Sequence, residues 1–371
     1  MKFTMERSEL IAAVNTVLKA MPSRAPSPLL ECILMEANLQ KNELRLLCTD
    51  TSLQIETFTP ASVELAGVIA VPGKLFGEII RRLPEGPIEI ELKEGQEKGN
   101  ALTIRQGKSK TNLQGMSPEE FPEMPVAISL SEFTIEQCKL SSMIRQTLFA
   151  TAQEDSRPIL TGGYLCSEGG MLRMVGLDGY RLAVRNEGCA FQDGISAVVP
   201  GASLSAIERV LGDEGMVKVD ISHTTALFDM GHTRINTVLL SGEYMKYQKI
   251  IPTERLTCVT VNRSELLSAI DRASLMAREG KNNLIRFSIG FDTLTITSNS
   301  EMGDVVEELP IALSGGELEI AFNAKYLTDV LKVLDSEEVV MEFTTNVSPC
   351  VVRPVEGSAW LYLVLPVRIF A

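Results

Sequence analysis

The sequence contains few of the residues from which catalytic and metal sites are commonly built. Only two histidines occur in 371 residues, His223 and His232, and neither lies near paired cysteines. The seven cysteines are scattered, and no C-x-x-C pair indicates a structural zinc site or a disulfide framework. We therefore expect free reduced thiols, no bound metal and no cofactor.

Long apolar stretches are also missing. No window approaches the roughly 20 apolar residues of a membrane-spanning helix. The first residues, MKFTMERSEL, are charged and do not resemble a signal peptide. We expect a cytoplasmic protein without a membrane partner. The apolar content of 45% suffices for hydrophobic cores, and the length of 371 residues predicts two or three domains.

Signature motifs of common enzyme classes do not occur. The sequence has no G-x-x-x-x-G-K-[ST], no G-x-G-x-x-G after a strand and no G-x-S-x-G. Asp50 and Asp178 suggest paired carboxylates, but the corresponding residue in a third segment is Asn299, and a turn-capping role suits all three. We therefore predict no catalytic residue. An enzyme with its active site between duplicated domains is the alternative hypothesis.

What the sequence does contain is a threefold internal repeat. Similar segments begin at Phe3, Phe133 and Val259, with offsets of 130 and 126 residues. A second helical segment, typified by VPGKLFGEIIRRL, follows in each copy, at 73–83, 201–212 and 323–334. The period is far too long for a solenoid, so each copy is expected to be a domain.

Each copy indicates an α+β domain in which two helices pack on antiparallel sheets. In the first helix Leu10, Val14 and Leu18 recur at i, i+4 and i+8, which predicts a buried stripe. Alternating apolar residues, as in 104–113, predict strands. Proline-containing segments near residues 125 and 254 resemble linkers. We therefore expect domains at 1–127, 128–254 and 255–371.

The net charge of −13 argues at first against a nucleic-acid ligand. However, the six predicted helices together carry +5 and the rest of the chain −18. Lys74 and Arg81 are two turns apart and share a helix face. Arg81 aligns with Arg209 and Lys332, so one position is basic in all three copies. These residues are either ordinary solvated charges or a positive surface that follows a polyanion loosely.

The ordered set of motifs resembles the bacterial DNA polymerase III beta subunit family, the DNA sliding clamps. The matching segments are MKFT-x-ER, VPGKLFGEIIRRLPEG, DGYRLAV, FNAKYLTDVL and LVLPVR, and they extend over essentially the whole chain. The resemblance implies three tandem DNA-clamp domains that form a head-to-tail homodimeric ring around double-stranded DNA without sequence preference. Such a ring tethers the replicative polymerase and confers processivity without catalysis of its own. A repeat-domain scaffold that binds proteins but does not encircle DNA is the alternative.

The resemblance also implies two sets of residues for ring assembly and DNA. For the subunit contact, the strand containing Lys110 and Leu113 would pair with the third-domain strand after Leu294, and Leu275 and Met276 would pack nearby. Leu275 and Met276 could equally be ordinary helix core. The candidate DNA-facing residues are Arg24, Lys74, Arg81, Arg157, Arg209 and Lys332.

A third set would bind peptides of the polymerase, the clamp loader and repair proteins. Met245 and Lys249 depart from the residues common in the family, and Leu177, Leu182 and Ile369 could be plain core. The candidate pocket residues are Leu160, Leu177, Gly179, Tyr180, Arg181, Leu182, Met245, Lys249, Ile250, Asn323, Tyr326, Val347, Pro349, Leu363, Leu365, Pro366, Val367, Arg368 and Ile369.

Overall fold

The computed structural model describes residues 1–22, 24–93, 101–124, 128–153, 157–191, 194–279 and 283–368. The chain divides into two compact units, 1–138 with 209–239 and 139–208 with 240–371. The domain boundaries predicted above stay predictions. Over these described ranges, no helix is both long and apolar enough to span a membrane.

The first unit contains two antiparallel sheets. One has the order β5 (Ser62–Leu65), β1 (Lys2–Glu6), β7 (Pro87–Lys93), β8 (Ala101–Gln106), β9 (Ser109–Gln114). The other has, within this unit, the order β10 (Ser131–Glu136), β16 (Met216–Ile221), β17 (Thr225–Asp229), β18 (Thr233–Val238), β4 (Leu53–Pro60), β3 (Glu43–Thr49), β2 (Cys32–Asn38), β6 (Gly67–Pro72).

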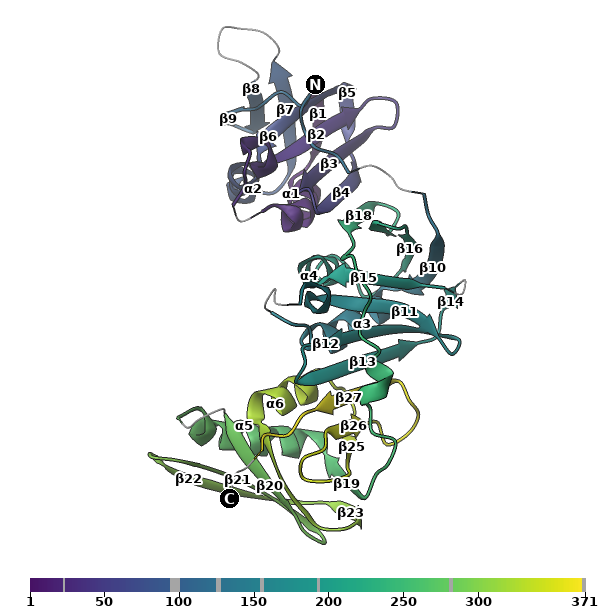
Figure 1. Ribbon diagram of the computed structural model, residues 1–371. Coiled ribbons are helices and arrows are strands. Elements are labelled where there is room, and N and C mark those ends of the chain that lie inside the picture. The colour runs from purple at the N-terminus through teal and green to yellow at the C-terminus, as the bar shows by residue number, and fades with distance from the viewer. Residues whose placement is uncertain are drawn as a thin grey trace. The chain divides into compact units, whose positions relative to one another are not determined.

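Two helices of the first unit pack against each other beside these strands (Figure 1). α1 (Arg7–Val17) continues into the short η1 (Leu18–Ala20), and η2 (Pro28–Glu31) follows. α2 (Gly73–Arg82) buries Phe76 and Ile80 and exposes Lys74 and Arg81, as its apolar spacing predicts. A Cβ atom at Gly77 would lie 3.3 Å from side-chain atoms of α1 and η1, so glycine permits this close helix contact.

The second unit has the sheet order β15 (Ser196–Pro200), β11 (Gly162–Glu168), β12 (Met171–Leu177), β13 (Arg181–Glu187), β27 (Trp360–Val364), β26 (Cys350–Arg353), β25 (Glu338–Phe343), β19 (Thr257–Asn262), β23 (Ala312–Gly315). A four-stranded sheet follows the order β22 (Gly303–Pro310), β21 (Thr293–Ser300), β20 (Leu284–Ile289), β24 (Leu318–Asn323). The short β14 (Ala190–Phe191), η3 (Pro158–Thr161) and η4 (Tyr247–Ile250) complete its minor elements.

The remaining helices also follow the predicted order. α3 (Gln137–Leu148) and α4 (Gly201–Glu208) belong to the second repeat, and α5 (Arg263–Glu279) and α6 (Ala324–Lys332) to the third. α5 and α6 pack together, and α5 lies on β20, β21 and β22 (Figure 1). All six helices predicted from the sequence are therefore confirmed.

In each repeat, the first residue of the first helix makes a hydrogen bond at the C-terminal end of the second helix. Arg7 donates from Nη2 to the carbonyl of Arg81 at 2.6 Å. Arg263 donates from Nη1 to the carbonyl of Leu331 at 3.2 Å. Gln137, at the same place in the second repeat, accepts a bond from the backbone N–H of Gly212, after α4. Because the last carbonyls of a helix have no partner within it, Arg7 and Arg263 stabilise these ends.

Strand pairing between repeats follows one rule. β18, the last strand of the second repeat, pairs antiparallel with β4 of the first. β27, the last strand of the third repeat, pairs antiparallel with β13 of the second. β4 and β13 are equivalent, since each follows the aligned turn at Asp50 or Asp178. By the same alignment β9 corresponds to β18 and β27, and β22 corresponds to β4 and β13. In the described sheets both β9 and β22 are edge strands.

The predicted turn caps are correct in two repeats and wrong in the third. Asp50 Oδ1 accepts from the backbone N–H groups of Ser52 and Leu53, and Asp178 Oδ1 caps its own turn in the same way. Asn299 instead lies inside β21, opposite Asp304. The strand register puts Ser300, one residue further along, at the place of Asp50 and Asp178, and its Oγ accepts from the backbone N–H of Met302 at 3.1 Å.

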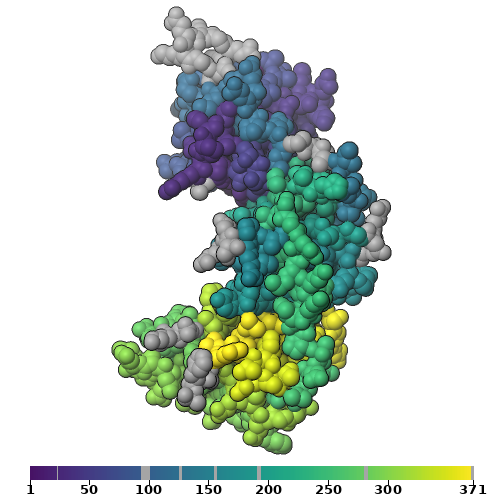
Figure 2. Space-filling model, in the orientation of Figure 1, coloured from purple at the N-terminus to yellow at the C-terminus, as the bar shows by residue number. Residues whose placement is uncertain are grey.

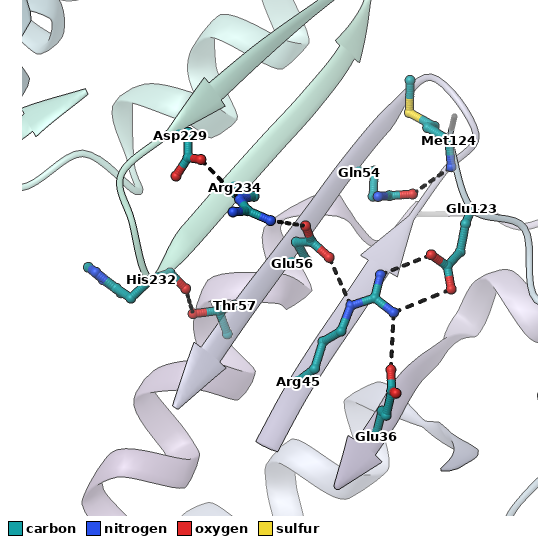
Figure 3. A network of polar contacts seen from close by, with 10 residues as sticks. All are labelled: Glu36, Arg45, Gln54, Glu56, Thr57, Glu123, Met124, Asp229, His232 and Arg234. Carbon is teal, nitrogen blue, oxygen red and sulfur yellow. Dashed lines mark hydrogen bonds and ion pairs between the residues drawn. The ribbon is translucent and has the colours of Figure 1, made fainter. Parts of the chain in front are cut away.

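A row of charged side chains crosses the β4–β18 junction (Figure 3). Arg45 Nε lies 2.8 Å from Glu56 Oε2, and Arg45 Nη2 lies 2.9 Å from Glu123 Oε2. Glu56 also faces Arg234, at 3.9 Å, and Arg234 pairs with Asp229 at 3.0 Å. The alternating charges join the closing strands of the second repeat to the sheet of the first, and they also fix the segment that contains Glu123.

Candidate functional sites

All six candidate DNA-facing residues are exposed. Arg81 Nη2 donates to Asn15 Oδ1 at 3.2 Å, which orients the guanidinium along the α1–α2 surface. Lys332 lies on α6, with its ammonium 3.9 Å from an oxygen of Asp271 on α5. Arg24 and Arg157 occupy corresponding loops, before η2 and η3. Exposure permits contact with phosphates, but a DNA-binding role for these residues stays a prediction.

The candidate subunit contacts lie beside the two edge strands. Lys110 is exposed on β9, whereas Leu113 on the same strand is 6% exposed and belongs to the core. Leu275 on α5 is 59% exposed, and Met276 is half-buried. Sequence reasoning missed the exposed apolar residues of the β21–β22 hairpin, Met302 and Val306. The sign that could have identified them is an apolar side chain on the outward face of an edge strand.

Four candidate pocket residues form part of a buried cluster. Leu160, Leu177, Leu182 and Leu363 are at most 3% exposed and pack together with Tyr244 and Tyr247. Register brings Leu182 opposite both Leu177 on β12 and Leu363 on β27. The core interpretation of Leu177 and Leu182 is therefore correct. Any contact with a peptide would be made by the more exposed candidate residues of the same unit.

Other candidates are at the surface of the same unit. Tyr180 is 60%, Val347 58%, Met245 and Ile250 38%, and Leu365 37% exposed. Gly179, Lys249 and Arg368 are also exposed, and Asn323, Tyr326, Pro349, Pro366 and Val367 are half-buried. Ile369 lies outside the described residues. Figure 2 shows the C-terminal part of the chain, in yellow, at the surface of the second unit.

The C-terminal segment is attached to two strands by backbone hydrogen bonds. The N–H of Leu365 donates to the carbonyl of Tyr180 at 2.9 Å, at the start of β13. The N–H of Val367 donates to the carbonyl of Ala321 in β24 at 2.8 Å. These bonds place Pro366 between the second and third repeats. The structure thus holds the C-terminal segment, which contains several candidate pocket residues, against the start of β13 and against β24.

Arg181 is the one charged candidate that is buried, at 7% exposed, among the candidate residues that the structure describes. Its Nε lies 3.0 Å from Asp178 Oδ2 and its Nη1 lies 2.6 Å from Asp329 Oδ2. The guanidinium carbon lies 5.2 Å from the ring centre of Phe149 and 4.8 Å from that of Tyr326. Phe149 and Asp329 were missed from the sequence, because their role depends on contacts between distant segments.

Tyr326 joins this buried group to the surface. Its ring is stacked on that of Tyr180, with centres 6.0 Å apart. Burial, together with the negative charge of Asp178, raises the pKa of the Tyr326 hydroxyl. The phenol therefore remains neutral at physiological pH and can donate a hydrogen bond. Asn323 caps α6, with Oδ1 accepting from the N–H of Lys325 at 3.0 Å.

The short η4 element carries Lys249 and Ile250 and is anchored by Glu168. Glu168 Oε2 accepts from the hydroxyl of Tyr247 and the amide of Gln248, each at 3.1 Å, and lies 2.6 Å from Arg173 Nη1. Burial alone would raise the pKa of Glu168. The hydrogen bond from Gln248 and the charge of Arg173 outweigh it, so this pKa lies below its usual range.

Three tandem repeats, each with two helices on antiparallel sheets and a basic residue at one shared helix position, define the chain as a clamp-fold protein. Residues 1–125, 134–246 and 248–368 match the family models of the N-terminal, central and C-terminal domains of the DNA polymerase III beta subunit. The chain belongs to this family, the beta sliding clamps, which are replication processivity factors.

Individual relatives agree over the whole length of the chain. The beta sliding clamps of Bacillus subtilis (strain 168) and of Synechocystis sp. are 35% and 30% identical to it, with 100% of both chains covered in each comparison. The crystal structure of the Bacillus subtilis DNA polymerase sliding clamp has a TM-score of 0.94 at 35% identity, with 100% of both chains covered. A Pseudomonas aeruginosa sliding clamp bound to griselimycin has a TM-score of 0.93 at 27% identity, also with 100% of both chains covered.

Proposed function

We propose that two copies of the chain form a head-to-tail ring around double-stranded DNA. The observation that carries this proposal is the pairing rule inside the chain. β18 pairs with β4 and β27 pairs with β13, which leaves the equivalent strands β9 and β22 at sheet edges. β9 of one subunit therefore pairs with β22 of the other, and two such contacts close the ring. The three repeats act as domains bounded near residues 127 and 254.

The side chains beside β22 support this contact. In the second repeat Phe149 packs against Tyr362 on β27, with ring centres 5.9 Å apart. Leu275 occupies the aligned position in the third repeat but is 59% exposed. Met302 and Val306 add exposures of 78% and 57% to the same region. A free strand edge with exposed apolar side chains is what a subunit interface covers.

DNA is held by enclosure, with only weak attraction from the helices. Arg81, Arg209 and Lys332 repeat one exposed basic position, whereas the sheets and loops carry the excess acid. Contacts with phosphates do not read base sequence, and loose contacts let the ring slide. The ring acts in the cytoplasm, where it tethers the replicative polymerase and makes synthesis processive, and the chain itself contributes no catalytic step.

The surface around Tyr180, Met245, Val347 and Leu365 binds extended peptide segments of the polymerase, the clamp loader and repair proteins. Exposed apolar side chains above a rigid leucine cluster suit the apolar anchors of such peptides. Lys249 adds a positive charge at the edge. Griselimycin, which is bound to the Pseudomonas aeruginosa relative, offers a competitor for a fluorescein-labelled peptide of the polymerase's clamp-binding segment.

Solution mass and DNA topology test the ring. Sedimentation should give a dimer. After loading by a clamp loader onto nicked circular DNA, the protein should remain bound at high salt and leave once the circle is linearised. Equal retention on circular and linear DNA would contradict the ring and favour a protein-binding scaffold.

Truncation tests the peptide surface separately. A chain that ends before Arg368 keeps the bond between Val367 and Ala321, so the dimer should form normally. Stimulation of the polymerase should be lost, because the end of the peptide surface is removed. Full stimulation by the truncated dimer would show that the peptides bind elsewhere.

A further inference from the structure

The second repeat buries a charge where the other repeats have uncharged residues. Arg181 follows the Asp178 turn as Leu53 follows the Asp50 turn, and Gly303 has the same place in the third repeat. Arg181 is 7% exposed and Leu53 6% exposed. Burying a guanidinium costs more than burying a leucine. Strand pairing therefore does not explain why this position is an arginine.

The contacts of Arg181 reach two segments that come from different repeats. Its Nη2 donates to the carbonyl of Phe149, after α3, at 2.5 Å, and its Nη1 pairs with Asp329 on α6 at 2.6 Å. The guanidinium lies between the rings of Phe149 and Tyr326, within 5.2 Å of each ring centre. Both its charge and its flat faces are thus used inside the protein.

The ring of Tyr326 connects the buried guanidinium of Arg181 with a side chain at the surface. Its other neighbour is Tyr180, stacked at 6.0 Å and 60% exposed. The groups are stacked in the order Phe149, Arg181, Tyr326 and Tyr180, and only the last is exposed. Tyr180 is also the residue whose carbonyl receives the N–H of Leu365. One buried cation therefore orders an exposed aromatic side chain next to the C-terminal segment.

We propose that Arg181 is a positioning residue for the partner-peptide surface and does not itself bind the peptide. This inference rests on the proposed function, because it assumes that the surface around Tyr180 and Leu365 receives the peptide. Arg181 fixes Tyr326 and Tyr180 in one orientation before the peptide arrives, so binding does not have to order these side chains. Lysine cannot replace it, because an ammonium group lacks the planar fork that pairs and stacks at once.

A double-mutant cycle on peptide affinity tests the proposal. The labelled polymerase peptide is titrated into the full-length dimer and its Arg181→Lys, Tyr326→Leu and doubly substituted forms. Each single substitution should weaken binding roughly tenfold, the order expected for loss of a desolvated cation–π contact. The double variant should bind no more weakly than the weaker single variant, because both changes release the same aromatic pair.

Arg185→Lys supplies the matched control. Arg185 lies on the same strand, and its guanidinium donates to the carbonyl of Ala359 at 2.8 Å and also to Asn186 and Glu187. This variant should lose thermal stability as Arg181→Lys does but keep the wild-type peptide affinity. If both variants lost peptide affinity equally, Arg181 would act only through the general stability of the fold, and the proposal would be overturned.

Two further outcomes are decisive. Additive losses in the cycle would mean that Arg181 contacts the peptide directly, which also overturns the proposal. Failure of the wild-type dimer to bind the peptide would instead overturn the proposed function, and this inference with it.

If Arg181→Lys does not fold, Tyr326→Phe is compared with Tyr326→Leu. The phenylalanine should retain affinity because it still stacks on the guanidinium, and loss of affinity in both variants alike would contradict the role of Arg181.

Discussion

Arg45 shows how one side chain can hold three segments together. Its guanidinium faces Glu36, Glu56 and Glu123 within 3.3 Å, and its side chain is 20% exposed (Figure 3). Arg45→Met would leave three carboxylates without their shared cation. We expect the free energy of unfolding, measured with urea, to fall by about 2 kcal/mol. Proteolysis near Glu123 should also become faster, because this segment loses its ionic attachment.

Arg105→Met is the control for this prediction. Arg105 also faces two carboxylates, Glu89 and Glu91, but at 37% its side chain is more exposed. Solvent screening should limit its effect to about 0.5 kcal/mol. Equal losses for the two variants would mean that neither the third carboxylate nor the lower exposure of Arg45 adds to stability.

Glu168 leads to a prediction on pH. Its pKa lies below the usual carboxyl range, so the ionised form is favoured in the folded state. This contribution is complete above the unfolded-state pKa of about 4.3 and is lost as pH falls through the lower folded-state value. Melting curves should show that Glu168→Gln is less stable than wild type at pH 7 and that the difference narrows below pH ~4.

Glu243→Gln separates this effect from general loss of charge. Glu243 is 82% exposed and lies 3.7 Å from Lys246, close to η4 in the chain. Exposed pairs of this kind contribute little, so its melting temperature should match that of wild type at both pH values. A constant difference between wild type and Glu168→Gln down to acid pH would contradict the assigned role of the carboxylate.

Helices show best which parts of the fold could be predicted from sequence. The spacing of Leu10, Val14 and Leu18 in one helix, and its recurrence in two further segments, sufficed to predict all six helices in order. The Asp50 and Asp178 turns were also predictable, because an Asx turn is local. Asn299 was wrong by one residue, since the strand register gives the turn position to Ser300 and the third segment has no aspartate there to mark it.

Prediction of the site failed where contacts span long distances in the chain. Arg181 was named from a motif, but its partner Asp329 is 148 residues away. Nothing local to either residue indicates the contact. The exposed candidates Tyr180 and Leu365 could be identified only from the family resemblance. The backbone hydrogen bond between them could be seen only in the structure.

The caps on the second helices give a prediction at the scale of one element. Arg263 donates to the carbonyls of Leu331 and Ser336, at the end of α6. Arg263→Ala should expose these carbonyls and lower the free energy of unfolding by about 1 kcal/mol. Hydrogen exchange should rise selectively in the last turn of α6. Arg278→Ala, at the exposed end of α5, should change neither quantity. Uniform exchange in both variants would argue against the cap.

For the whole molecule, the repeats explain how an acidic protein would act on DNA in the way proposed above. The same strand-pairing rule applies twice within the chain, and the equivalent strands β9 and β22 lie at sheet edges, where the proposal pairs them between two copies. The helices carry basic residues at a repeated position, although the net charge is −13. In the proposed ring, enclosure would remove the need for high affinity, and the acidic residues elsewhere would oppose binding of DNA outside the ring.

Removing two of the candidate DNA-facing charges, one in a loop and one on α2, tests this division of charge. The Arg24→Gln, Lys74→Gln variant and the matched Lys41→Gln, Lys246→Gln variant change the net charge equally, and all four residues are exposed. Affinity for a short duplex is measured by fluorescence anisotropy across a salt series. The first variant should bind more weakly, with its salt slope reduced by at most about 4 for the four charges of a dimer, and by less where water intervenes. The second should match wild type, and both should sediment as dimers. Equal weakening in the two variants would mean that DNA responds only to net charge, and it would contradict the DNA-facing role proposed for Arg24 and Lys74.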